Sequence, residues 1–239
     1  MKDAIRRNFD ASVGSYEAFE AETGQFAALA DRLATVVDDA TGDLESLLDA
    51  GAGTGASTRR LEGLARQVVA LDISRPMLRE NPAGRRVQAD FDHLPVGDGS
   101  FDAVVFTASL FLTPDPDRAA AEAARVLRPG GVVAAVAPQG WTTADGRDAF
   151  AALSRESRSP SAAAEVESAL AGRFSLETGT WTDEVSAERL RRFHSIPAVA
   201  ARLYPTLPPE ERVAKARALL ADVEGPLEQR WRWLLGRLE

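Results

Sequence analysis

The spacing of apolar residues changes twice along the chain and divides it into three regions. In residues 3–39 apolar side chains recur three or four positions apart, as at Ile5, Phe9 and Val13, which predicts helices with a break at residues 14–19. Short apolar runs, each expected to form a strand, then cover residues 44–49, 67–72, 86–91, 101–106 and 132–137. Because helical segments separate these runs, the pattern predicts a parallel sheet joined by right-handed crossovers.

The third region mixes both spacings. Helices are expected at residues 145–153, 161–170, 187–193 and 210–223, and strands at residues 174–181 and 230–235. Together the strands predict a doubly wound α/β sheet of seven strands, mostly parallel and finished by an antiparallel edge strand. We expect a single domain over residues 1–239, with a helical lid at 1–42, a ligand-binding core at 43–138 and C-terminal strands with a helical insertion at 139–239.

Composition narrows the classes of function. The chain has 239 residues, of which 45% are hydrophobic, so it can bury a sizeable core. Its net charge of −8 opposes a nucleic-acid partner, which needs a basic face. The absence of cysteine excludes disulfides and thiolate zinc sites, and we expect no metal site. No apolar run reaches about 18 residues, so we expect a cytoplasmic protein with no membrane partner, of unspecified oligomeric state.

A glycine-rich stretch, LLDAGAGTG at residues 47–55, follows the first predicted strand. Its glycines at every second position permit backbone angles and close approaches that a Cβ would forbid. Asp72 ends the next predicted strand, 21 residues after Gly51, where a carboxylate can accept both hydroxyls of a ribose. The residues alone leave the nucleotide open, because Gly51-x-Gly53-x-x-Ala56 with Asp72 also fits a nicotinamide cofactor.

The combination of five motifs adds a family resemblance. The motifs are LDAGAGTG at 48–55, LDISRPML at 71–78, ADFDHLP at 89–95, DGSFD at 98–102 and RVLRPGG at 125–131. In this order and spacing the sequence resembles a class I S-adenosylmethionine-dependent methyltransferase over about residues 45–138. The resemblance implies a Rossmann-like fold and S-adenosylmethionine as the cofactor.

The resemblance also implies which residues bind that cofactor. They are Tyr16, Asp49, Gly51, Gly53, Gly55, Asp72, Ile73, Met77, Asp90, Phe91 and Thr107. In this family the positions of Asp49, Asp72 and Asp90 hold the amino end, the ribose hydroxyls and the adenine amino group, respectively. Ile73 and Met77 would pack against the adenine.

Residues 5–16, which include Tyr16, are similar to the opening of the biotin-pathway malonyl-acyl carrier protein methyltransferases and of several small-molecule methyltransferases. Residues 107–114, after the fourth predicted strand, contain no arginine that could receive a malonyl carboxylate. The resemblance therefore implies methyl transfer to a small molecule or a carrier-bound acyl group, without choosing between them.

Four side chains outside the motifs are candidates for an acceptor pocket. Tyr16, Phe111, Trp141 and His194 should converge over the carboxyl ends of the strands, where open α/β sheets bind ligands. His194 is a candidate general base because imidazole titrates near neutral pH. Three of the four are aromatic and none carries a fixed positive charge, which predicts a largely apolar acceptor. A protein that binds the cofactor without catalysis and a nicotinamide-dependent oxidoreductase remain the alternatives.

Overall fold

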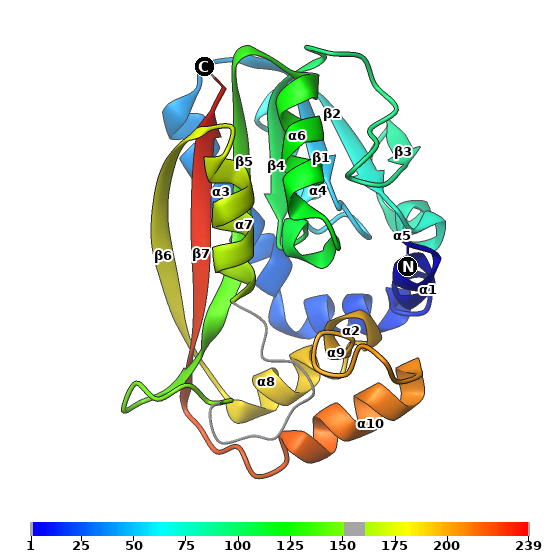
Figure 1. Ribbon diagram of the computed structural model, residues 1–239, viewed down its shortest axis with the longest axis vertical. Coiled ribbons are helices and arrows are strands. Elements are labelled where there is room, and N and C mark those ends of the chain that lie inside the picture. The colour runs from blue at the N-terminus through cyan, green and yellow to red at the C-terminus, as the bar shows by residue number, and fades with distance from the viewer. Residues whose placement is uncertain (1, 151–160, 239) are drawn as a thin grey trace.

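A seven-stranded sheet runs through the middle of the computed structural model, which describes residues 2–150 and 161–238 (Figure 1). The strands are β1 (Leu44–Ala50), β2 (Ala65–Asp72), β3 (Arg86–Gln88), β4 (Phe101–Thr107), β5 (Leu127–Thr143), β6 (Ser175–Val185) and β7 (Leu227–Arg237). Their order across the sheet is β3-β2-β1-β4-β5-β7-β6. The first five pair in parallel, which confirms the predicted doubly wound arrangement.

The antiparallel strand differs from the prediction in its position. β7 pairs antiparallel with both β5 and β6, so it lies one place inside the sheet and β6 forms the edge. Trp231 and Leu234 of β7 are buried, as is usual for a strand inside a sheet whose faces are covered. β6 exposes Thr180, Thr182 and Glu184, and such polar residues suit an edge strand.

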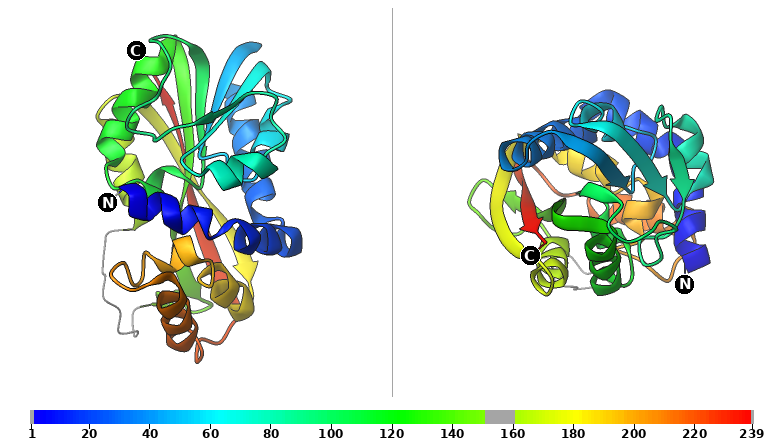
Figure 2. Two further views of the ribbon diagram at one scale, coloured as in Figure 1. Left: turned by 90° about the vertical axis from the view of Figure 1, so that its right-hand side faces the viewer. Right: turned by 90° about the horizontal axis from the view of Figure 1, so that it is seen from above.

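The helices form two groups. Their bounds are α1 (Lys2–Asp10), α2 (Val13–Thr23), α3 (Gln25–Ala40), α4 (Thr58–Leu61), α5 (Arg75–Glu80), α6 (Pro116–Val126), α7 (Ala162–Ala171), α8 (Ala187–Phe193), α9 (Pro197–Ala200) and α10 (Pro209–Leu219), with a 3₁₀ turn η1 (Leu110–Leu112). The helices α3, α6 and α7 cover the faces of the sheet. The helices α8, α9 and α10 gather beyond the carboxyl ends of the parallel strands, and α1 crosses between them and the sheet (Figure 2).

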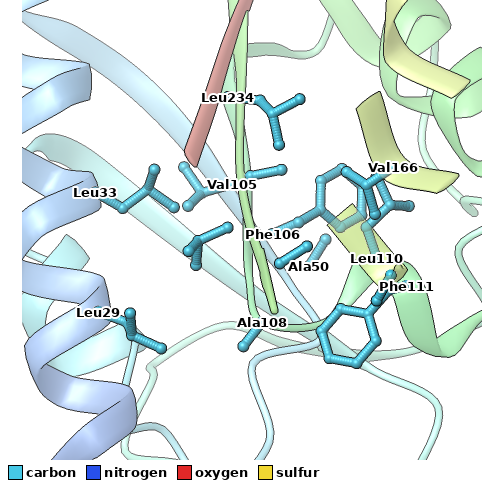
Figure 3. Close-up of a cluster of buried hydrophobic side chains, with 14 of the residues drawn as sticks. Leu29, Leu33, Ala50, Val105, Phe106, Ala108, Leu110, Phe111, Val166 and Leu234 are labelled. Carbon is cyan, nitrogen blue, oxygen red and sulfur yellow. The ribbon is translucent and has the colours of Figure 1, made fainter. Parts of the chain in front are cut away.

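The core forms on both faces of β4 (Figure 3). Leu29 and Leu33 of α3 lie on one side of the strand, and Phe106 lies on the other side with Val166 of α7. Each of these side chains is at most 2% exposed. Complete burial of such a side chain stabilises the fold by about 1.5–3 kcal/mol, so this layer holds the strand ends in fixed positions.

Two local predictions were wrong. Residues 14–19 lie within the helix α2, and the chain turns instead at Ser12, whose hydroxyl donates to Asn8 O at 2.6 Å, and at Gly24 (φ +57°). Residues 145–150 form a turn rather than a helix, because Gly146 has φ +81° and Thr143 N–H donates to Arg147 O at 2.9 Å. The rest of that predicted helix, residues 151–153, lies outside the described residues.

The start of β5 also differs from the prediction. The strand begins at Leu127 rather than at residue 132, and it includes the Arg128–Gly131 stretch. Gly130 has φ +79° there, and the register with β4 shifts between Phe101 and Ala103.

Among residues 2–150 and 161–238, no helix is long and apolar enough to cross a membrane.

Candidate functional site

The glycine-rich loop, residues 51–55, leaves the carboxyl end of β1 with left-handed backbone angles. Gly51, Gly53 and Gly55 have φ of +80°, +51° and +95°. A Cβ at Gly51 would overlap the side chain of Ser109, and one at Gly55 would overlap Pro82. Gly53 has open space around it. Gly51 and Gly55 are therefore required by packing, whereas Gly53 faces room for a ligand.

Asp72, at the end of β2, faces this loop. Its Oδ2 accepts from Gly53 N–H at 2.9 Å and its Oδ1 from Ser74 N–H at 2.8 Å. Burial raises the pKa of Asp72 to about 6, and the nearby charge of Asp10 acts in the same direction. Because each carboxylate oxygen can accept further hydrogen bonds, Asp72 can also receive two ligand hydroxyls.

Asp49 lies behind the wall of the cavity described below rather than in it. Its carboxylate accepts from Ser57 Oγ at 2.8 Å and from Thr58 Oγ1 at 2.7 Å, and the residue is fully buried. Burial raises the pKa of Asp49 to about 6. Ser57 itself lines the cavity, so Asp49 can influence a ligand there through this hydroxyl.

A cavity opens between the loop, α5 and the N-terminal helices, and most of the predicted cofactor residues line it. They are Tyr16, Gly51, Gly53, Asp72, Ile73, Met77, Asp90, Phe91 and Thr107. Asp49 and Gly55 are absent from this lining. Sequence reasoning missed Ile5, Phe9 and Glu20, whose helical spacing gave only a packing signal.

One buried polar atom in the cavity wall indicates that a ligand binds there. The hydroxyl of Thr107 is buried, and within the described part of the chain it has no hydrogen-bond partner. Buried hydroxyls normally have a hydrogen-bond partner, and a polar ligand group beside Thr107 would provide one. The open space at Gly53, the acceptor oxygens of Asp72 and this hydroxyl together suit the sugar and amino-acid parts of S-adenosylmethionine.

The N-terminal helices close the cavity with aromatic rings. Tyr16 stacks on Phe9 at 6.3 Å and contacts Phe26 at 5.6 Å between ring centroids. Burial, together with the negative charge of Asp72, raises the pKa of Tyr16 well above its usual range. Tyr16 is therefore a protonated hydrogen-bond donor at neutral pH. Glu20 accepts from Phe26 N–H at 2.8 Å and fixes the start of α3 at this wall.

A second cavity lies beside the first and is lined by Phe111, Trp141 and His194, as predicted, together with Phe150 and Phe193. The ring centroid of His194 is 6.0 Å from that of Trp141 and 5.2 Å from that of Phe150. We call this the aromatic cavity. Tyr16, which was expected both here and among the cofactor residues, lines the first cavity. Leu112 of η1 lines both cavities.

His194 has a defined tautomer in the aromatic cavity. Its Nδ1 lies 3.0 Å from Leu190 O, and the residue is 8% exposed. Since a carbonyl oxygen only accepts, Nδ1 carries the proton of the neutral ring and Nε2 is the basic nitrogen.

The aromatic cavity also contains a cation that the sequence did not reveal. Arg202 lines it, donates from Nη1 to Phe111 O at 2.5 Å and lies 5.3 Å from the centre of the Phe111 ring. Its Nη2 is 3.5 Å from Glu165, which compensates the charge. Arg202 and Phe111 are 91 residues apart, so no local motif relates them.

Comparison with known proteins gives one family match. Residues 48–135 match the model of a methyltransferase domain. A malonyl-[acyl-carrier protein] O-methyltransferase of Pectobacterium atrosepticum is 33% identical over 137 residues, 56% of this chain and 52% of that protein. A demethylmenaquinone methyltransferase of Renibacterium salmoninarum is 39% identical over 105 residues, 40% of this chain and 43% of that protein. The chain thus spans about half the length of the curated relatives it matches.

Solved structures agree on the fold. The YcgJ protein of Bacillus subtilis superposes with a TM-score of 0.58 at 16% identity, covering 87% of this chain and 97% of that one. The [4+2]-cyclase SpnF gives a TM-score of 0.55 at 24% identity, covering 87% and 81%. These similarities extend from the sheet into the flanking helices.

Proposed function

We propose that this chain is a class I S-adenosylmethionine-dependent methyltransferase that transfers the methyl group of S-adenosylmethionine to a small molecule or a carrier-bound acyl group. The observation that carries the proposal is the first cavity. Motif residues from the ends of β1, β2 and β4 meet in its wall, where Asp72 and Thr107 offer polar partners to a ligand.

Five of the cofactor residues have specific roles in this proposal. S-Adenosylmethionine supplies, when bound, a methyl group on a sulfonium that is already activated toward nucleophiles. Asp72 accepts the ribose hydroxyls, and Asp90 with the Phe91 backbone holds the adenine. Thr107 gives its unpaired hydroxyl to the methionine part. Asp49 acts through Ser57, to which it is hydrogen-bonded.

The chain contributes to rate by placing the acceptor and excluding water. The rings of Phe9, Tyr16 and Phe26 cover the first cavity from the lid side. We assign the acceptor to the aromatic cavity, which meets the first cavity at Leu112. There His194 Nε2 would take the proton of an acceptor hydroxyl or amine.

The lining of the aromatic cavity supports a largely apolar acceptor. Phe111, Trp141, Phe150 and Phe193 supply most of its large side chains, and Arg202 is compensated by Glu165. The net charge of −8 supports an acceptor other than nucleic acid. The single-domain organisation and the cytoplasmic location expected from the sequence are part of this proposal. The nicotinamide alternative has no support from the methyltransferase match.

Methyl transfer from radiolabelled S-adenosylmethionine tests the proposal. The protein is incubated separately with a small-molecule extract, a malonylated carrier protein, RNA and DNA, and label is expected in the first or second. Label in nucleic acid would overturn the acceptor class. Cofactor binding with no transfer to any sample would favour a binding protein without catalysis.

The His194→Gln variant tests the proposed base. We expect a loss of about 100-fold in kcat, because positioned proton transfer typically contributes that much, with unchanged affinity for S-adenosylhomocysteine. The matched control is His93→Gln, which changes the other histidine of the chain, an exposed loop residue, and should leave kcat unchanged.

A further inference from the structure

We infer that Asn81 is a positioning residue for the cofactor, because its side-chain amide holds the glycine-rich loop in the conformation that binds. The inference rests on the assignment of S-adenosylmethionine to the first cavity. Asn81 follows α5, is 2% exposed and lies behind the loop rather than in the cavity wall.

Both the nitrogen and the oxygen of the Asn81 side-chain amide form hydrogen bonds. Its Nδ2 donates to Gly53 O at 3.2 Å and to Thr58 Oγ1 at 3.0 Å, with Ala52 O at 3.4 Å. Its Oδ1 accepts from Ala83 N–H at 2.9 Å. The donor end therefore faces the loop, and the acceptor end is tied to the segment that carries Asn81.

These contacts fix Gly53 from two sides. Asp72 accepts the Gly53 N–H at 2.9 Å, while Asn81 donates to the Gly53 carbonyl. Thr58, the other partner of Asn81, donates to the buried Asp49. The amide thus connects the loop to both motif carboxylates. Glycine has the largest backbone freedom to lose, so a loop of alternating glycines needs such external contacts to keep one shape.

The segment that carries Asn81 is itself held in place. Arg86 donates from Nη1 to Asn81 O at 3.1 Å and to Leu78 O at 3.0 Å, which closes the end of α5. Pro82 packs so closely on Gly55 that a Cβ there would overlap it, and the same Cβ would lie 3.2 Å from Asn81 Cγ. The amide is therefore presented to the loop in one orientation.

The Asn81→Asp variant tests the donor role with almost no change in shape. The new carboxyl can still accept from Ala83 N–H, but when ionised it cannot donate to Gly53 O or Thr58 Oγ1. We expect the Kd for S-adenosylhomocysteine, measured by calorimetry at pH 7.5, to rise about 10- to 100-fold relative to wild type, as two hydrogen bonds are lost. Lowering the pH to about 4, near the ordinary pKa of aspartate, protonates about half of the carboxyl groups and restores one donor, so the ratio of variant to wild-type Kd should shrink. The ratio cancels the pH dependence of Kd that Asp49 and Asp72 cause in both proteins.

Gln67→Glu is the matched control. It makes the same amide-to-carboxylate change at the opposite end of β2 from Asp72, and its Kd ratio should stay within about twofold at both pH values. The side chain of Asn81→Ala has no hydrogen-bond donor and no titratable group, so this variant should bind S-adenosylhomocysteine about tenfold more weakly than wild type at both pH values. It provides the test if Asn81→Asp is unfolded at pH 7.5.

The outcomes separate two failures. If folded Asn81→Asp and Asn81→Ala bind like Gln67→Glu, the role of Asn81 is overturned while the cofactor site stands. If wild type does not bind S-adenosylhomocysteine at all, the proposed function fails instead. A purely structural role for Asn81 would lower the Tm without giving a pH-dependent Kd ratio.

Discussion

The first cavity, called the cofactor cavity from here on because we assign S-adenosylmethionine to it, and the aromatic cavity share Leu112. They take their other residues from the chain in different ways. The cofactor cavity is built mainly where β1, β2 and β4 end, from residues of the sequence motifs. The aromatic cavity joins side chains of η1, β5, α8 and the segment after α9. A site built on motifs at strand ends suits a constant ligand, whereas a site of side chains from distant segments can change its ligand by substitution. The two relatives are consistent with this difference, since both are methyltransferases but their names give different acceptors.

The cavities also differ in their electrostatics. In the cofactor cavity burial raises the pKa of Asp72 to about 6, and the same holds for Asp49 behind it. Among the described residues that line the aromatic cavity, Arg202 is the one with a fixed positive charge, with Glu165 near it, and Asp148 lines the same cavity. Cofactor binding should therefore respond to backbone strain and pH, and acceptor binding to the shape of rings.

The largest expected effect is that of Gly51→Ala. The residue has φ +80°, and a Cβ would overlap Ser109 and lie 3.0 Å from Phe91 Cζ, so the loop must move. We expect affinity for S-adenosylhomocysteine to fall about 100-fold or more, since left-handed strain alone costs about 1–2 kcal/mol and the overlap adds to it. The control is Gly99→Ala, which has φ +59° but no heavy atom within 4 Å of the added Cβ. Equal affinities of the two variants would contradict the close-approach argument.

Asp72→Asn should have the next largest effect. The variant loses the charge with which, in our proposal, Asp72 accepts the ribose hydroxyls, which corresponds to about 1.5–3 kcal/mol or about 10- to 100-fold in Kd. Calorimetric titration with S-adenosylhomocysteine measures it. Asp117→Asn, at an exposed position of α6, is the matched control. An unchanged Kd in folded Asp72→Asn would place the ribose elsewhere.

The pH should affect affinity and stability in opposite directions. With pKa values of about 6, Asp72 and Asp49 become protonated between pH 7 and pH 5 and lose their charge as acceptors. Affinity for S-adenosylhomocysteine should fall about tenfold over this range for one essential carboxylate. Without ligand, the raised pKa values mean that the folded state binds more protons than the unfolded state between about pH 4 and pH 6, so the free energy of unfolding contributed by these groups decreases as the pH rises. Affinity that is flat from pH 7 to pH 5 would contradict this prediction.

The contrast between the cavities also explains what could be predicted from the sequence. Asp72 and Gly53 are 19 residues apart in consecutive strand–loop units, and parallel strands bring their ends together, so the motifs alone located them. The depth of Asp49 was not predictable, because it depends on the hydroxyls of Ser57 and Thr58 turning toward it.

The aromatic cavity was predicted less completely because long-range packing decides it. Phe111, Trp141 and His194 were chosen for their positions after strands and near a helix end, and they do meet. Arg202 reaches Phe111 across 91 residues, and no spacing rule covers such a contact. Tyr16 was expected both among the cofactor residues and over the acceptor, and the N-terminal helices carry it over the cofactor side, where Phe9 and Phe26 pack against it.

The smallest expected effect concerns one ring of the aromatic cavity. Trp141 is 4% exposed, and its ring lies 6.0 Å from both Phe193 and His194. Trp141→Phe removes part of that surface while keeping an aromatic ring, which corresponds to about 0.5–1.5 kcal/mol or about two- to tenfold in affinity. Binding of 2-naphthol as an apolar aromatic probe should weaken by this factor, while the Kd for S-adenosylhomocysteine stays unchanged.

The control for Trp141→Phe is Trp233→Phe. Trp233 stacks on Trp181 at 6.2 Å near the β6 edge, and it lines neither of the two cavities described above. Its substitution should change neither binding constant. If Trp141→Phe instead weakened S-adenosylhomocysteine and spared the probe, the assignment of the two cavities would have to be exchanged. The effect is small, but its direction separates the two cavities, because Trp141 lines the aromatic cavity and not the cofactor cavity.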